Sequence, residues 1–247
     1  SSNHQICYNK LVRKKKNLGK LSQKRFKKRH GVFTFFIFFL LLTAIILSLL
    51  SKYYPYFPFD ILITKNIQSI NFFWFQELMK LITYIGNPFP GFIIVIVIVG
   101  FLFFKLKSRE TLFLLFSTCG AVVISMFLKV LILRPRPTPD LVMQVGYFVN
   151  RDSFPSGHVL FYIGLFGFLA YLFYVSKIRS PLRKSLLIFL TILLFSIGLS
   201  RIYLGAHWFS DVMGAYIIGL LWLIVVINFY RKVKLNLILR KVTAFKL

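Results

Sequence analysis

Cysteine and acidic side chains are scarce in this sequence. Only two of its 247 residues are cysteines, Cys7 in a basic stretch and Cys119 in an apolar one, so neither a disulfide framework nor a cysteine metal site is available. Only six residues are Asp or Glu, against 32 Lys and Arg. In a soluble chain this balance would suggest a nucleic-acid partner, but here the basic residues cluster at the ends of apolar runs. We therefore expect no nucleic-acid binding.

Apolar residues dominate the rest of the chain. Hydrophobic residues make up 57% of it, and the mean hydropathy of +0.74 is outside the range of soluble proteins. A membrane-spanning helix needs about 20 mostly apolar residues. We therefore predict an all-α integral membrane protein with six transmembrane helices. The predicted spans are 32–50, 88–104, 111–128, 159–176, 185–200 and 212–230.

The distribution of Lys and Arg predicts an orientation. With a cytoplasmic N-terminus, about three quarters of the 32 basic residues lie on the cytoplasmic side, as the positive-inside rule requires. We predict a multi-pass protein of the cell membrane with both termini in the cytoplasm. Segment 1–30 is expected to be a basic tail at the lipid surface, 31–232 the membrane domain, and 233–247 a second basic cytoplasmic tail. The first apolar run is too long for a signal peptide, so we expect it to remain as a span.

The connection between the first two spans has its own pattern. Segment 60–86 alternates apolar and polar residues at roughly helical spacing. We predict an interfacial helix on the outer side, with Trp74 among its aromatic anchors. A seventh span is disfavoured because Lys65, Glu77 and Lys80 interrupt the segment.

Ionisable residues gather at the outer ends of the predicted spans. Six of them lie there or in the adjoining loops: Lys129, Arg136, His158, Arg201, His207 and Asp211. Alone, Lys129 or Arg201 would be interpreted as a basic anchor that reaches the interface, and Asp211 as a helix cap. Their joint occurrence on one side favours a functional site, because polar groups at this depth are costly.

The surrounding sequence suits a phosphate group. Lys129, Arg136 and Arg201 supply three fixed cations, and the turn Pro155-Ser156-Gly157-His158 opens a helix. Basic side chains neutralise the charge of a phosphate, and backbone N–H groups at a helix N-terminus add donors aimed along its dipole. We therefore predict that the backbone N–H groups of Ser156 and Gly157 also contact the phosphate.

The two histidines fit covalent phosphoryl transfer. His207 and Asp211 are four residues apart and share a face if the last helix includes both. A carboxylate bound to one ring nitrogen leaves the other free to attack phosphorus, and His158 would then protonate the leaving oxygen. The implied route is a phosphohistidine that water hydrolyses, with the cations stabilising the transferred group.

These pieces resemble the signature motifs of the type 2 phosphatidic acid phosphatase superfamily, which is related to the soluble vanadium haloperoxidases. The family pattern is K-x6-R-P, P-S-G-H and S-R-x5-H-x3-D, and every fixed position occurs between residues 129 and 211 at the family spacing. The resemblance implies a metal-independent phosphatase without a cofactor that acts on lipid phosphates or diphosphates. His207 would be the nucleophile, Asp211 would orient it, and His158 would be the general acid. The phosphate would be held by Lys129, Arg136, Ser156, Gly157 and Arg201.

Several substrates and activities stay open within this resemblance. The preferred hypothesis is a polyprenyl diphosphate, such as undecaprenyl diphosphate, that enters from the outer leaflet. Phosphatidylglycerophosphate, phosphatidic acid and lipid A phosphates are alternatives. A phosphotransferase would use the same site with a lipid or sugar hydroxyl as acceptor. A non-catalytic lipid-binding protein is disfavoured because His158, His207 and Asp211 are all intact. The oligomeric state is left open.

Other ionisable residues on the outer side are assigned no chemistry. We expect them to be solvated loop residues: Arg134, Asp140, Arg151 and Asp152. The alternative for Arg134 and Arg151 is contact with a second phosphate or a head group. His4 and His30 lie in the basic tail and are given no role.

Overall fold

The computed structural model describes residues 31–105, 108–146 and 152–244, and no strand occurs in these ranges. The chain divides into two units, 1–42 and 43–247. The helix Gly31–Tyr53 begins in the first unit. The elements that follow all belong to the second unit: α2 (Pro58–Gln68), α3 (Phe73–Ile85), α4 (Pro88–Lys105), α5 (Ser108–Ile132), α6 (Gly157–Tyr162), the π-helix η1 (Ile163–Gly167), α7 (Phe168–Tyr174), α8 (Ser180–Tyr203) and α9 (Phe209–Ala244).

The apolar helices agree with an all-helical membrane protein. Five are long and apolar enough to cross a membrane: Gly31–Tyr53, Arg109–Ile132, Gly157–Tyr174, Ser180–Tyr203 and Phe209–Asn236. A sixth span results if α3 and α4, which are bent by 64° relative to each other, count as one. The predicted span 88–104 therefore qualifies only together with α3. The orientation of the helices and of the termini stays a prediction.

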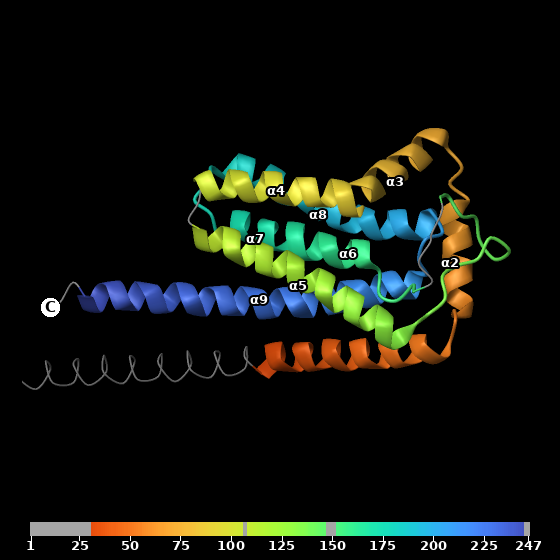
Figure 1. Cartoon of the computed structure of the whole chain (residues 1–247), viewed down its shortest axis with the longest axis horizontal. Coiled ribbons are helices and arrows are strands. Elements are labelled where there is room, and N and C mark those ends of the chain that lie inside the picture. The colour runs from red at the N-terminus through yellow and green to blue at the C-terminus, as the bar shows by residue number, and fades with distance from the viewer. Residues whose placement is uncertain (1–30, 106–107, 147–151, 245–247) are drawn as a thin grey trace, which may run out of the picture. The chain divides into compact units, whose positions relative to one another are not determined.

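The predicted single interfacial helix over 60–86 is wrong, because α2 and α3 are separate helices. The break contains Ser69 and Asn71, whose side chains compete with helical hydrogen bonds, and the Ser69 hydroxyl donates to the carbonyl of Asn66. In Figure 1, α2 crosses the end at which α8 finishes and α9 begins, and it contacts both helices. α3 instead packs along α8 and leads into α4.

The last helix is longer than the predicted span. α9 continues to Ala244, so most of the predicted tail 233–247 is helical. The sequence between 231 and 244 contains no Gly or Pro to end the helix. The predicted N-terminal tail 1–30, with His4 and His30, lies outside the described residues, and so does Arg151.

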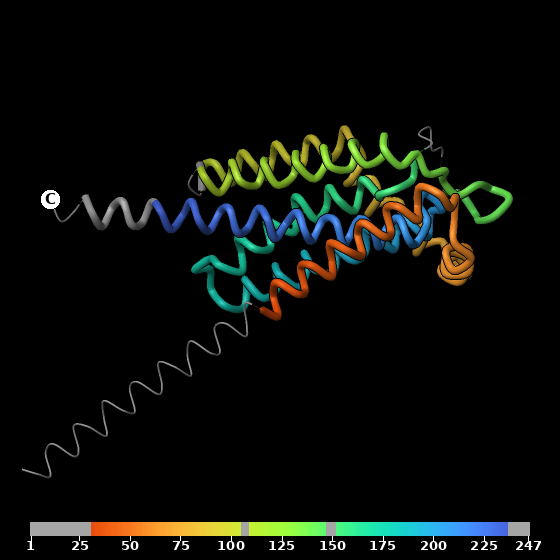
Figure 2. Tube along the Cα trace, turned by 90° about the horizontal axis from the view of Figure 1, so that it is seen from below, coloured from red at the N-terminus to blue at the C-terminus, as the bar shows by residue number. Residues whose placement is uncertain are grey.

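Small residues set the contact between α5 and the continuous helix formed by α6, η1 and α7. A Cβ atom at Gly164 would lie 2.8 Å from the Ala121 Cβ and 2.9 Å from the Ser117 carbonyl oxygen. Small side chains let helix backbones approach closely, which favours association where water supplies no hydrophobic driving force. Figures 1 and 2 show α5 running beside the α6–η1–α7 helix. This contact brings Lys129, near the end of α5, to the start of α6, and Lys129 and His158 line the same cavity.

We expect Gly164→Ala to loosen this contact. The added methyl group has no room between two backbones, and overpacking of this kind costs about 1–3 kcal/mol. The apparent melting temperature in detergent should fall by several degrees. Gly100→Ala in α4 is the matched control, because no atom lies within 4 Å of its added Cβ. Equal melting temperatures for the two variants would contradict the close approach of η1 and α5.

Candidate active site

One cavity of about 550 Å³ brings together six of the eight predicted site residues: Lys129, Arg136, Gly157, His158, Arg201 and His207. Its other wall comes from α3, the start of α4 and two loops: Lys80, Thr83, Tyr84, Asn87, Pro88, Val145, Gly146 and Leu204. The remaining two predicted residues, Ser156 and Asp211, are fully buried and do not line the cavity. The motif residues are therefore arranged in two layers, one facing the cavity and one behind it.

Two of the cations are fixed by backbone carbonyls. Lys129 donates from Nζ to the Asp152 carbonyl at 2.6 Å, and Arg136 donates from Nη1 to the Ala206 carbonyl at 2.7 Å. Burial lowers the pKa of Arg136, although the nearby carboxylates of Asp211 and Asp152 oppose this effect. The loop that contains Arg136 is thus tied directly to the turn before α9.

The third cation links α8 to α3. Arg201 lies in the last turn of α8, is buried, and donates from Nη1 to the Thr83 hydroxyl at 3.2 Å. Its neighbour Ser200 has its hydroxyl 2.6 Å from that of Thr83 and donates to the Met79 carbonyl. The Ser-Arg pair of the motif therefore positions the cavity wall formed by α3. Sequence reasoning missed Thr83, because one hydroxyl in an amphipathic segment carries no chemical signal.

A tight turn delivers His207. Gly205 has a φ of +65°, a backbone conformation that residues with a Cβ rarely adopt. The N–H groups of Ala206 and His207 both donate to the Arg201 carbonyl, at 3.0 and 3.3 Å, which closes the end of α8. The five residues between Arg201 and His207 in the motif thus span one helix C-terminus and its turn.

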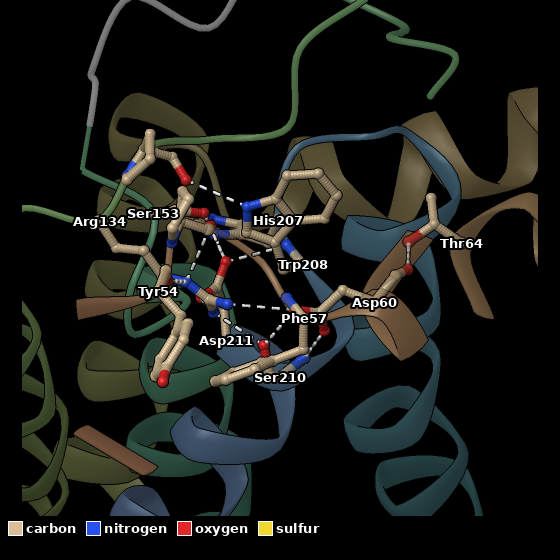
Figure 3. Close-up of polar contacts among 12 residues, drawn as sticks. Tyr54, Phe57, Asp60, Thr64, Arg134, Ser153, His207, Trp208, Ser210 and Asp211 are labelled. Carbon is tan, nitrogen blue, oxygen red and sulfur yellow. Dashed lines mark hydrogen bonds and ion pairs between the residues drawn. The ribbon is translucent and has the colours of Figure 1, made fainter. Parts of the chain in front are cut away.

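Asp211 and His207 lie within ion-pair distance, but the direct hydrogen bond predicted between them is replaced by one through Ser153. His207 Nδ1 is 3.8 Å from Asp211 Oδ2, and Ser153 lies between them (Figure 3). Its Oγ donates to Asp211 Oδ2 at 2.5 Å and is 3.4 Å from His207 Nδ1. The Trp208 N–H donates to the same carboxylate oxygen at 2.9 Å. Because α9 begins at Phe209, His207 precedes the helix, and the four-residue spacing does not place both side chains on one helical face.

The surroundings of His207 favour its neutral form. Burial, together with the cations Arg136, Arg201 and Lys129, lowers the pKa of His207 well below its usual value. A neutral imidazole has one nitrogen with a free lone pair, and which nitrogen this is depends on the partner of the other. With Nδ1 beside Ser153, Nε2 is the nitrogen that can act as a nucleophile.

The second histidine has a partner that the sequence did not reveal. His158 Nε2 lies 3.1 Å from Asn87 Oδ1. Asn87 occupies the bend between α3 and α4, within the sequence Gly86-Asn87-Pro88. Such a cluster indicates a turn, and nothing in it indicates a contact with a residue 71 positions away.

The turn before α6 differs in part from its predicted role. The Ser156 N–H was predicted to contact the phosphate. It donates instead to the Asp211 carbonyl at 3.3 Å and is therefore already occupied. The Ser156 hydroxyl is buried and has no partner within the described part of the chain. A Cβ at Gly157 would lie 3.1 Å from Ser125 Oγ and 3.8 Å from Lys129 Cε. Glycine therefore keeps the space beside Lys129 open.

The prediction that Arg134 is a solvated loop residue is wrong. Its side chain is 0% exposed and forms ion pairs with Asp60 at 3.1 Å and with Asp211 at 2.5 Å. Asp60, predicted to lie in the interface, is buried as well. The sequence could not show this because the partners lie 74 and 77 residues away. Asp140, by contrast, is exposed as predicted.

Comparison with known proteins agrees with the motifs. The model of the PAP2 superfamily matches residues 110–235. Phosphatidylglycerophosphatase B of Bacillus subtilis is 30% identical over 177 residues, which cover 71% of this chain and 85% of that protein. Lipid A 4'-phosphatase of Porphyromonas gingivalis is 32% identical over 136 residues, covering 49% of this chain and 52% of that protein.

A solved structure shares the fold. It is the crystal structure of a transmembrane PAP2 type phosphatidylglycerolphosphate phosphatase from Bacillus subtilis, with a TM-score of 0.69 and 27% identity, and the match covers 79% of this chain and 96% of that one. The family resemblance predicted from the motifs is thereby confirmed. The chain belongs to the PAP2 superfamily and is a membrane lipid phosphatase.

Proposed function

We propose that this phosphatase removes a phosphate from a lipid head group in two steps at the cavity lined by His207 and His158. In the first, His207 Nε2 attacks phosphorus, the P–N bond forms, the P–O bond to the lipid breaks, and His158 gives its proton to the departing oxygen. In the second, His158 takes a proton from water, whose oxygen attacks phosphorus and releases inorganic phosphate from His207. The observation that carries this proposal is the meeting of both histidines with three cations in one cavity.

The cations have a specific part in this scheme. Lys129, Arg136 and Arg201 approach the cavity from three different elements, so together they surround a bound phosphate. Phosphoryl transfer leaves most of the catalytic work to positioning and to stabilisation of charge on the equatorial oxygens. These donors are already held by hydrogen bonds to the protein, which favours a site that needs little rearrangement when the substrate binds.

For the lipid, we favour a phosphomonoester of the phosphatidylglycerophosphate type. Two relatives are named for enzymes that act on phosphatidylglycerophosphate and on the 4'-phosphate of lipid A. The polyprenyl diphosphate preferred from the sequence, and phosphatidic acid, remain alternatives for the same site. We also propose, from the distribution of Lys and Arg, that the cavity opens on the extracytoplasmic face of the cell membrane.

Phosphate release across a lipid panel tests the proposed reaction. We expect detergent-solubilised protein in excess EDTA to release phosphate, with phosphatidylglycerophosphate preferred over undecaprenyl diphosphate, phosphatidic acid and a lipid A phosphate. His207→Ala should abolish release, because it removes the attacking nitrogen. Release that survives this substitution would refute the nucleophile assignment. Release that requires an added alcohol acceptor would identify a phosphotransferase.

The pH dependence of kcat/KM tests the state of His207. Because burial and nearby cations lower its pKa, the nucleophile becomes protonated only well below pH 6.5. After correction for the second ionisation of the substrate phosphate, near pH 6, the acid limb of kcat/KM, on which His207 becomes protonated, should lie below pH 6.5. Arg136→Gln removes a cation that disfavours the imidazolium, so the acid limb should move to higher pH. A shift to lower pH would contradict this account.

The space beside His158 gives a separate test. A Cβ at Gly86 would lie 2.6 Å from His158 Cδ2 and 3.1 Å from Tyr162 Cε2, while the Gly86 backbone, with φ of −91°, is allowed for any residue. Gly86→Ala should therefore displace the imidazole and lower kcat by about 10- to 100-fold, as small misplacements of catalytic groups do. Gly100→Ala is the control with open space. An unchanged kcat in Gly86→Ala would argue against His158 as the proton donor.

A further inference from the structure

Arg134 is held on all sides by groups outside the cavity. Its Nη1 donates to the Ser210 hydroxyl at 2.7 Å and to Asp211 Oδ1 at 2.5 Å, and its Nη2 donates to Asp60 Oδ2 at 3.1 Å. Its Nε points to the carbonyls of Tyr54 and Pro55, at 3.3 and 3.2 Å. The guanidinium carbon also lies 5.0 Å from the centre of the Phe57 ring. Figure 3 shows this cluster joining Asp60 to Asp211.

The two carboxylates that it joins have equivalent places in two helices. Asp60 is the third residue of α2, and its Oδ2 accepts the N–H of Phe57, the residue before that helix, at 3.0 Å. Asp211 is the third residue of α9, and its Oδ2 accepts the N–H of Trp208, again the residue before the helix. Each carboxylate thus caps its helix and interacts with the positive end of the helix dipole. Arg134 binds both, so the starts of α2 and α9 are fixed to each other.

Ser210 strengthens the same junction. Its N–H donates to Asp60 Oδ1 and its hydroxyl to Asp60 Oδ2, both at 2.8 Å. Ser210 directly precedes Asp211 in α9, so Asp60 holds the backbone next to the carboxylate that Arg134 binds. A buried charge without a partner is costly, and this cluster supplies partners to all three charged groups.

Arg134 differs from Arg136, although only one residue separates them. Arg136 lines the cavity, whereas Arg134 is not among its lining residues and its donors point toward α2 and α9. Asp211 is in turn linked through Ser153 to His207. A change at Arg134 therefore reaches the nucleophile without touching the phosphate-binding groups.

We propose that Arg134 is a positioning residue, which holds the Asp211 carboxylate beside Ser153 and His207, and that Asp60 of α2 holds Arg134 for this task. Helix α2 then contributes to catalysis in addition to any contact with lipid. The inference rests on the proposed role of His207 and extends it to a helix that lies before residues 110–235, the part matched by the family model.

The test uses the full-length protein in detergent and the lipid that the panel shows to be hydrolysed. Arg134→Met should lower kcat by about 100-fold while the inhibition constant of inorganic phosphate stays within about threefold. Arg136→Gln should weaken phosphate inhibition instead, because that residue faces the cavity. Asp60→Asn should lower kcat by about tenfold, with phosphate inhibition unchanged. Asp140→Asn removes an exposed carboxylate and should have no effect.

A double variant separates positioning from stability. Arg134→Met leaves two buried carboxylates without their cation and can prevent folding. In Asp60→Asn/Arg134→Met one of these charges is also gone, so the melting temperature should recover relative to Arg134→Met while kcat stays low. Recovery of kcat to near the wild-type value would overturn the proposal, and so would a wild-type kcat in Asp60→Asn. Loss of phosphate inhibition in a folded Arg134→Met protein would make Arg134 a binding residue and would also overturn it.

The pH profile of kcat/KM should stay unchanged in Arg134→Met if Arg134 only stabilises the fold. The charged and titratable groups around His207 are Lys129, Arg136, His158, Arg201 and Asp211. Arg134→Met removes the cation that pairs with Asp211. The uncompensated carboxylate then stabilises the imidazolium of His207 and raises the pKa of that histidine, so the acid limb of kcat/KM should move to higher pH. Asp60→Asn removes a negative charge and should not move it upward. An unmoved limb in Arg134→Met would contradict the proposal, whereas activity in His207→Ala would refute the proposed function itself.

Discussion

One buried arginine between two carboxylates holds together the parts of the chain on which the site depends. Burying a lone charge in an apolar bundle is costly, so Arg134, Asp60 and Asp211 are stable inside only as partners. Their ion pairs join the start of α2, the loop after α5 and the start of α9. His207 lies two residues before α9, and the loop that carries Arg134 also carries Arg136. The relative positions of the proposed nucleophile, His207, and of Arg136, a cation proposed to bind phosphate, therefore follow from this junction.

Basic groups line the cavity, whereas the acidic group lies behind its wall, and this arrangement affects both the proposed phosphate binding and the reactivity of His207. Among the described residues that line the cavity there are basic side chains and histidines but no Asp or Glu, while the carboxylate of Asp211 lies behind the wall. A positive cavity attracts a phosphate dianion. Burial, together with these cations, lowers the pKa of His207, which keeps the imidazole neutral and therefore able to act as a nucleophile. The same cations thus contribute both to the proposed binding of the phosphate and to the neutral state of the histidine.

Hydropathy and motif spacing predicted most of the helices and six of the residues that line the cavity, because both are local properties of the sequence. Lys129, His158 and Arg201 lie near helix ends, and a helix end can be predicted from an apolar run. What could not be predicted are contacts between distant segments. Arg134 was expected to be solvated because its partner Asp60 lies 74 positions away in the sequence. Ser153 was missed for the same reason, because it lies 54 positions before His207 and 58 positions before Asp211, the two residues that its hydroxyl contacts.

The cavity is formed by one part of the chain that the family model matches and by another part that it does not match. All the basic residues and histidines that carry the proposed chemistry lie within the matched residues 110–235. The opposite wall, with Thr83, Tyr84 and Asn87, comes from α3 and the bend before α4, outside that match. This wall nevertheless touches the motif residues directly, since Thr83 accepts from Arg201 and Asn87 pairs with His158. A change in α3 therefore alters both the wall of the cavity and the setting of the proposed catalytic groups, so we expect substrate choice and rate to be coupled through this helix.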